Sequence, residues 1–263
     1  MSLVFAAITP HSPALIPNIG KDKLDVIKKT KEAMEKLEAE LYVTKPNVII
    51  TISPHGSFFK DAFTVNAHTH FMSSFEEFGD VATKKEWYGI PELAALVSRA
   101  QMHTKTPARL VSQEKLDHGA TIPLHYLTKH LPNVKILPIG YSEFSTKEHI
   151  NFGSALKEVI SHQSLRIAVI ASGDLSHSLT HDSPVKFNEK GKEFDNILIE
   201  LLETRNTLGI SNFSEELIKG ASECGYRSIL ILLGILKNKN FHFKNLSYEH
   251  PFGVGYLVGK FDF

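Results

Sequence analysis

Three short apolar runs along the chain each end in a turn that carries a histidine. The clearest run, residues 48–52, is nearly continuous and rich in β-branched side chains, which predicts a strand buried on both faces of an α/β sheet. It stops at SPHG, where proline cannot continue a sheet ladder. The three runs are residues 3–8, 48–52 and 165–171, and they lead to His11, His55 and His177. Because ligands bind at the carboxyl ends of strands in open α/β sheets, we expect the three histidines to share one edge.

Helical patterns alternate with further strand-like runs along the rest of the chain. Amphipathic or apolar helices are predicted at residues 21–43, 91–102, up to about 131 after a loop at His118, 146–160, 184–204, 215–220 and 227–236. Additional strands are predicted at residues 62–70, 108–111, 134–139, 241–249 and 253–261. Residues 71–90 fit neither period and are interpreted as a loop that covers a site. With no repeat, linker or low-complexity segment, residues 1–263 are predicted to form one α/β domain.

Composition narrows the classes of function. The 29 basic and 29 acidic residues cancel, so no nucleic-acid-binding patch is indicated. The apolar runs are shorter than a membrane span, and no signal peptide precedes them. Cys224 is the one cysteine, which excludes an intrachain disulfide framework. We therefore expect a cytoplasmic protein that binds neither nucleic acid nor membrane, and whose 14 histidines require an explanation.

Histidines and a carboxylate at one sheet edge could hold a metal ion. Two histidines and one carboxylate form the facial triad of non-haem Fe(II) oxygenases, although imidazole suits zinc equally well. A further histidine outside that set would be a candidate acid or base, and His118 and His177 are candidates for that role. The spacing alone does not decide which histidines are ligands.

Two other histidine and carboxylate patterns have ordinary explanations. Glu223 stands near the start of the apolar helix 227–236, where a carboxylate is favoured by the helix dipole. His68 and His70 would share one face of a strand at i, i+2. That spacing can serve a metal, but a half-exposed strand is the favoured interpretation.

Five segments of the chain resemble the class III extradiol ring-cleavage dioxygenases, the family of the LigB-type catalytic subunit. They are ITPHSPALIP, TISPHG, DHGATIPL, ASGDLSHSL and GASECGYRSILILLG, in family order. The resemblance implies an α/β sandwich with a central mixed, mostly buried sheet flanked by helices. It implies His11, His55 and Glu223 as Fe(II) ligands, His177 as the catalytic acid/base, and His118 as a contact to substrate or bound oxygen.

The ending HPFGVGYLVGKF, together with ECGY, is similar to the Memo-like branch of the same superfamily, including the AmmeMemoRadiSam system protein B group. Members of that branch have a cysteine as a metal ligand. Glu223 and Cys224 are adjacent, so either could supply the third ligand, and the glutamate is favoured because it matches the dioxygenase pattern.

Three functions follow as hypotheses. The first is an extradiol dioxygenase that takes a small catecholic aromatic and dioxygen. The second is a Memo-like protein that binds Zn or Cu instead of Fe(II), in a redox or interaction role and without ring cleavage. The third is a zinc hydrolase with metal-activated water. The sequence does not give the oligomeric state, but many members of the resembling family associate, so a homo-oligomer is one expectation.

Overall fold

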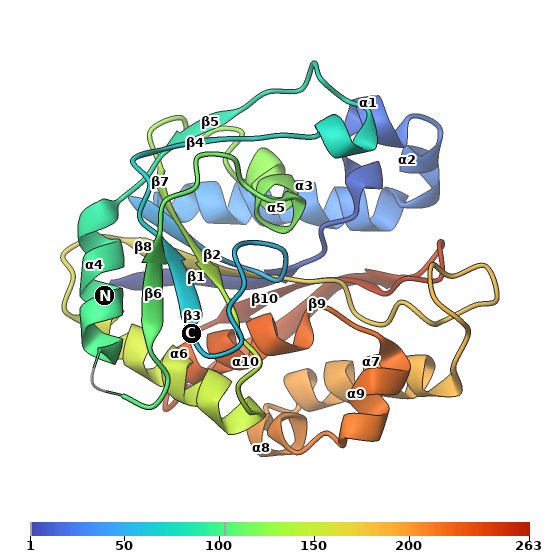
Figure 1. Ribbon diagram of the computed structural model, residues 1–263. Coiled ribbons are helices and arrows are strands. Elements are labelled where there is room, and N and C mark those ends of the chain that lie inside the picture. Colours follow the sequence, from blue (N-terminus) through green and yellow to red (C-terminus); the bar gives the residue numbers. More distant parts are fainter. Residues whose placement is uncertain (1, 103) are drawn as a thin grey trace.

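The computed structural model describes residues 2–102 and 104–263 and is built on one eight-stranded mixed sheet (Figure 1). The strands lie in the order β6 (Ala108–Val111), β3 (Phe63–Asn66), β7 (Lys135–Gly140), β2 (Val48–Ser53), β8 (Ile167–Ser172), β1 (Leu3–Thr9), β10 (Tyr256–Asp262) and β9 (His242–Glu249). The central pairs β7–β2, β2–β8 and β8–β1 are parallel. The pairs β3–β7, β1–β10 and β10–β9 are antiparallel.

Helices cover both faces of this sheet (Figure 1). The upper layer contains α1 (Pro17–Gly20), α2 (Lys23–Val26), α3 (Lys28–Thr44) and α5 (His118–Leu127), with the short 3-10 turn η1 (Pro13–Leu15). The other face is covered by α4 (Pro91–Gln101), α6 (Thr146–Ser161), α7 (Glu189–Glu203), α8 (Thr207–Ser211), α9 (Glu215–Ala221) and α10 (Tyr226–Ile235). The mixed α/β sandwich predicted from the sequence is therefore confirmed.

The central strands are apolar throughout because each of their faces packs against a helical layer. On β2, Val48 and Ile50 join the cluster that includes α6 and α10, whereas Ile49 joins the cluster that includes α3 and α5. All three side chains are fully buried. Two covered faces explain why a continuous run, rather than an alternating one, specifies this strand.

The parallel strands bring the predicted histidine turns to one edge. Thr9 pairs with Ser172, and Ser53 pairs with Gly140, so β1, β8, β2 and β7 end level with one another. His11 follows β1 and His55 follows β2. The sheet register thus brings the two turns to the same edge, on either side of the end of β8.

Some boundaries differ from the sequence prediction. The helix predicted at residues 21–43 is divided into α2 and α3 at Ile27, whose buried side chain packs against the cluster around η1. The helix predicted at 184–204 begins only at Glu189, after the N-cap Asn188. His118, predicted in a loop, is the first residue of α5, because the Asp117 side chain accepts the Ala120 N–H and caps the helix there.

The segment 71–90 is more regular than the predicted loop. It contains most of β4 (His70–Met72), the 3-10 turn η2 (Glu76–Phe78) and β5 (Glu86–Tyr88), and the two strands pair as an antiparallel hairpin. Trp87 is buried and donates its indole N–H to the Thr128 hydroxyl at 2.9 Å. Three-residue strands give too few alternations for a sequence pattern to reveal them.

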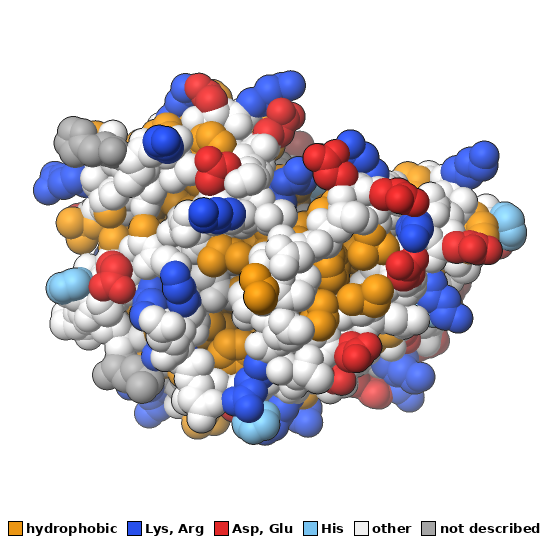
Figure 2. All heavy atoms as spheres, turned by 90° about the horizontal axis from the view of Figure 1, so that it is seen from below, with side chains coloured by type: hydrophobic (Ala, Val, Ile, Leu, Met, Phe, Trp, Pro, Cys, Tyr) orange, Lys and Arg blue, Asp and Glu red, His pale blue; other side chains and the backbone are white. Residues whose placement is uncertain are grey.

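The surface carries both apolar and charged side chains. In the view from below, apolar side chains gather near the middle of the face and charged side chains surround them (Figure 2). Within residues 2–102 and 104–263, no helix has the length and apolar character needed to cross a membrane.

Candidate metal centre

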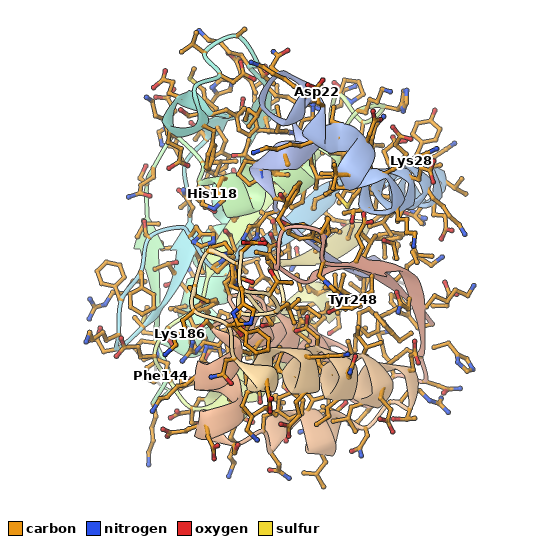
Figure 3. All side chains as sticks on the ribbon, turned by 90° about the vertical axis from the view of Figure 1, so that its right-hand side faces the viewer. Asp22, Lys28, His118, Phe144, Lys186 and Tyr248 are labelled. Carbon is orange, nitrogen blue, oxygen red and sulfur yellow. The ribbon has the colours of Figure 1, made fainter. Side chains whose placement is uncertain are left out.

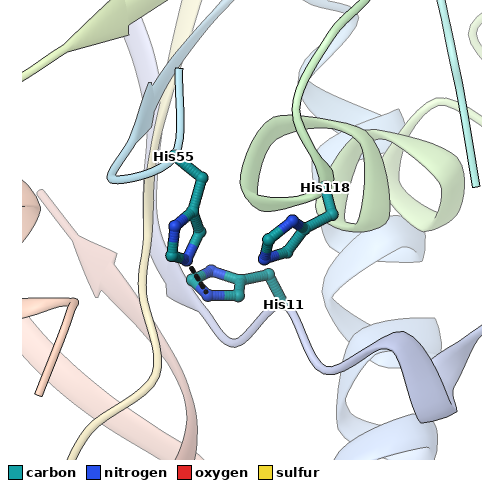
Figure 4. A group of neighbouring side chains, drawn as sticks. All are labelled: His11, His55 and His118. Carbon is teal, nitrogen blue, oxygen red and sulfur yellow. Dashed lines mark hydrogen bonds between the residues drawn. The ribbon is translucent and has the colours of Figure 1, made fainter. Parts of the chain in front are cut away.

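His11 and His55 point their ring nitrogens at each other at the edge where β1 and β2 end (Figure 4). Their Nε2 atoms are 3.1 Å apart, and the rings meet edge to face with centroids 4.8 Å apart. An imidazole nitrogen lies about 2.1 Å from a bound first-row metal ion, so both nitrogens can reach one ion. The structure therefore brings together the two predicted histidine ligands.

Hydrogen bonds to Ser172 fix which nitrogen of His11 carries the proton. The Ser172 hydroxyl donates to the Gly119 carbonyl at 2.5 Å, and its oxygen lies 3.0 Å from His11 Nδ1. Because that hydroxyl proton is already used, His11 Nδ1–H must donate to Ser172 Oγ. His11 Nε2 then has a free lone pair directed at His55. This outer partner is the kind that orients a metal ligand.

His118 is the third histidine of the group. The ligand-type nitrogens of His11, His55 and His118 all lie within 4.8 Å of one another, and the His118 ring stacks on His55 with centroids 4.3 Å apart. Its Nδ1 contacts the Glu77 carboxylate at 3.2 Å, which ties it to η2. Figure 3 shows His118 at the start of α5, and 22% of its side chain is exposed. The position suits a ligand or a substrate contact.

Cys224, in the turn between α9 and α10, lies against His11. Its Sγ is 3.5 Å from His11 Nε2 and accepts the Asp174 backbone N–H at 3.3 Å. Asp174 in turn accepts the His11 backbone N–H at 2.9 Å. Burial raises the pKa of the thiol well above its ordinary value, so a metal ion would have to displace its proton.

Glu223, the favoured third ligand, is engaged elsewhere. Its Oε2 accepts the Tyr226 backbone N–H at 2.5 Å, at the start of α10, as the helix-dipole explanation anticipates. Burial raises the pKa of this carboxyl to about 7. In the part of the chain that the structure describes, the three-histidine group does not include it. Its role as a ligand stays a prediction.

His177 stands beside this group in the loop that follows β8. Its backbone N–H donates to the Ala221 carbonyl at 2.9 Å. Its Nδ1 is buried and has no hydrogen-bond partner among residues 2–102 and 104–263. Burial lowers its pKa, so the ring is held neutral and could accept a proton. His68 and His70 lie apart from the group, because they contact Ser112 and Glu86.

The histidine group carries little charge of its own. Burial, followed by the neighbouring imidazoles, lowers the pKa of His11 well below its ordinary range. The same causes lower the pKa of His55 to about 4. Neutral imidazoles are the form that binds metal ions, so His11 and His55 can take a cation without first losing a proton.

A pocket of about 700 Å³ opens beside His55 and His118. Its polar walls include Ser57, Thr64, Asn66, Gln113 and Asp117. This volume is within the range of small-molecule sites. A substrate could therefore lie next to the histidines.

Sequence reasoning missed the supporting residues Ser172, Asp174 and Asp117. Asp174 lies in the GDLSH motif, and Asp117 precedes His118 in DHGATIPL. Both aspartates are polar residues close to a candidate histidine, and this position is a signal by which the sequence could have indicated them. Ser172 carried no such signal, because a serine that ends a strand is ordinary. Its role depends on the Gly119 carbonyl, which is 53 residues away in the chain.

Comparison with known proteins gives matches along the whole chain. Residues 5–259 match the family profile of the catalytic LigB subunit of aromatic ring-opening dioxygenase. Protein CA_C1420 of Clostridium acetobutylicum is 31% identical over 271 aligned positions, which cover 100% of this chain and 58% of that protein. The chain thus spans little more than half the length of this curated relative.

A solved structure shares the fold. The crystal structure of the uncharacterized protein JW3007 from Escherichia coli K12 superposes with a TM-score of 0.69 and 16% identity, and the match covers 98% of this chain and 99% of that one. At this identity the likeness concerns the fold alone. The profile match spans nearly all of the sequence that forms the sheet and the histidine group, and on that basis the chain belongs to the family of the LigB catalytic subunit of aromatic ring-opening dioxygenases.

Proposed function

We propose that the chain binds one Fe(II) ion between His11 and His55 and opens the ring of a small catecholic aromatic with dioxygen. The observation that carries the proposal is the pair of Nε2 atoms 3.1 Å apart, beside a pocket of about 700 Å³. The free lone pair that Ser172 leaves on His11 Nε2 fits a cation better than a second neutral imidazole. Family membership supplies the reaction class.

The chain's own residues have separable parts in this function. His11 and His55 would hold the ion, and Fe(II) when bound would supply the open coordination positions that bring catechol and dioxygen together. His118, stacked on His55 at the pocket wall, would contact the substrate. His177, neutral and with no partner at Nδ1 in the described part of the chain, would accept the proton of a catechol hydroxyl.

A second candidate is a Memo-like metal protein with a redox or interaction role and no ring cleavage. The specific observation is Cys224 Sγ, 3.5 Å from His11 Nε2, while an oxygen of Glu223 is bound to the Tyr226 N–H. A thiolate ligand favours softer ions such as Cu(I) or Zn(II). The identity of the third ligand therefore separates the two candidates.

Anaerobic loading with Fe(II), followed by metal quantification and exposure to air with a catechol panel, tests the first candidate. One iron per chain and a yellow ring-opened product would support it. If the iron-loaded protein forms no ring-opened product with any catechol of the panel, the dioxygenase proposal is refuted. His177→Phe should keep its iron and lose turnover by about 10²-fold or more, and unchanged turnover would remove His177 from the mechanism.

Two matched variants test the second candidate. Cys224→Ser and Glu223→Gln change adjacent side chains with little change in volume. Loss of copper or zinc binding in Cys224→Ser alone would support the Memo-like ligand set. Loss of iron in Glu223→Gln alone would support the dioxygenase set.

A further inference from the structure

A second cavity lies away from the histidine group, among α3, α5 and the hairpin β4–β5. It has a volume of about 560 Å³, and Figure 1 shows the hairpin passing over the two helices. Its walls carry an unusual density of charge for their size, with Lys31, Glu35, Glu38, Lys85, His125 and Lys129 among the lining residues. Nothing in the proposed reaction uses them.

Lys85 is held in this cavity by contacts of both its backbone and its side chain. Its backbone N–H donates to Ser73 Oγ at 2.7 Å, and its carbonyl accepts the Ser73 N–H at 2.8 Å. Its Nζ donates to the His125 carbonyl at 3.2 Å and lies 5.9 Å from the centre of the buried Trp87 ring. The backbone is therefore fixed and the amine is half withdrawn from water.

The carboxylates around the cavity already have other partners. Glu35 pairs with Lys31 at 3.7 Å, and Glu38 pairs with His130 at 2.9 Å. No carboxylate of residues 2–102 or 104–263 lies within 4.0 Å of Lys85 or Lys129. Within the described residues these two amines therefore form no direct salt bridge, so the cavity matches a ligand that carries negative charge.

A lysine near the end of a helix often only caps the last carbonyl groups. That explanation accounts for one donor of Lys85, to the carbonyl of His125 near the end of α5. It does not explain why the amine faces a cavity of this size with a second unpaired lysine on the wall. Amines desolvated next to other cationic groups are the ones that proteins use as nucleophiles towards carbonyl carbons.

We propose that Lys85 is a reactive amine that forms an imine with a small aldehyde or keto compound carrying a carboxylate or phosphate. The unprotonated Nζ attacks the carbonyl carbon and forms the C–N bond, and the carbonyl oxygen leaves as water after two proton transfers. The reaction is reversible and needs no oxidant or reductant. The anionic group of the ligand would face Lys129.

The protonation behaviour of Lys85 agrees with this role. Burial lowers its pKa from 10.5 to about 8, although Glu38 acts in the opposite direction. At pH 7.5 a group with that pKa is unprotonated in roughly a quarter of molecules, against roughly one in a thousand for an ordinary lysine. The other titratable groups that line the cavity are Lys31, Glu35, His125, Tyr126 and Lys129, and His130 pairs with Glu38.

Glyoxylate with cyanoborohydride, followed by peptide mapping of the trapped amines, tests the proposal on the full chain. Lys84 is the internal control, since it is the adjacent residue and is exposed. We expect the initial labelling of Lys85 to exceed that of Lys84 by at least about tenfold. Equal or faster labelling of Lys84 would overturn the proposal.

The preference for an anionic ligand is tested separately with acetaldehyde, which is small and neutral. The ratio of Lys85 labelling to Lys84 labelling should be several-fold higher with glyoxylate than with acetaldehyde. Lys129→Gln should remove this difference and leave the labelling by acetaldehyde unchanged. If glyoxylate and acetaldehyde label Lys85 with equal selectivity in the wild-type protein, the proposed preference for an anionic ligand is refuted. Lys85→Arg, which keeps the charge but forms no imine, should lose the labelled peptide.

Discussion

Two buried polar clusters lie close to the loop that follows β8, and they differ in how their polar atoms are satisfied. In the histidine group, the Nε2 atoms of His11 and His55 are hydrogen-bonded to each other at 3.1 Å, a contact that a metal ion could replace by binding both nitrogens. In the cluster around Asp195, each carboxylate oxygen has a donor, because Ser176 N–H binds Oδ1 at 2.8 Å and Tyr248 O–H binds Oδ2 at 2.6 Å. The first cluster is open to a ligand, whereas the second is closed.

This difference separates a candidate functional site from a structural support. Burial alone does not distinguish them, since His11 and Asp195 are both nearly inaccessible to solvent. Both also have pKa values shifted mainly by burial, which lowers that of His11 and raises that of Asp195 to about 7. The convergence of ligand-type nitrogens from three histidines is the feature that points to an ion.

The largest expected difference between the two clusters is in metal affinity, and it is expected for His11→Ala. Because it deletes a proposed ligand, metal affinity should fall by more than the roughly 100-fold that marks the upper range for loss of an outer-shell partner. Competition titration with a chromogenic chelator measures the affinity. Asp195→Asn is the control and should retain it. Wild-type affinity in His11→Ala would contradict the proposed site.

A smaller effect, on stability rather than on metal binding, is expected for Asp195→Ala. The substitution leaves Ser176 N–H and Tyr248 O–H without their buried acceptor, which should lower the free energy of unfolding by about 3 kcal/mol. Urea denaturation of the metal-free protein gives the value. A loss of metal affinity without a loss of stability would show that the two clusters are not distinct in role.

The closed cluster should also make stability depend on pH. The folded-state pKa of Asp195 is raised from 3.8 to about 7, so between these values the unfolded chain is ionised while the folded chain keeps its proton. Stability therefore falls as pH rises through this window, by about 2 kcal/mol between pH 5 and 7. The measurement is the unfolding free energy of the wild type minus that of Asp195→Asn at each pH. A difference that stays constant across the window would contradict the assignment.

The sequence predicted the open cluster better than the closed one for a physical reason. Apolar runs ending at His11 and His55 are local signals, and parallel pairing necessarily brings the ends of neighbouring strands together. The contact of His118 with both of them depends on where α5 packs, which no local pattern contains. The family motifs, rather than the spacing of residues, associated His118 with His11 and His55.

The third ligand shows where sequence reasoning stops. Glu223 and Cys224 are adjacent in the sequence. The sequence therefore places both side chains near the site and does not decide which of them faces the histidines. The hydrogen bond from Tyr226 N–H to Glu223 and the contact of Cys224 with His11 depend on how the turn before α10 is seated on Asp174. That seating involves residues 50 positions apart. Neither propensity nor motif spacing encodes it.

The smallest effect that tests the comparison is expected for Ser172→Ala. Ser172 does not touch the proposed ion, but it accepts the Nδ1 proton of His11 and so directs the Nε2 lone pair towards His55. Its loss should weaken metal binding about tenfold, the lower range for an outer-shell partner. Thr51→Val is the matched control, since the Thr51 hydroxyl on β2 is buried and has no hydrogen-bond partner within residues 2–102 and 104–263. Equal metal affinities in the two variants would show that the tautomer of His11 does not matter for the site, whereas a tenfold difference would tie the open cluster to the hydrogen bond that prepares it.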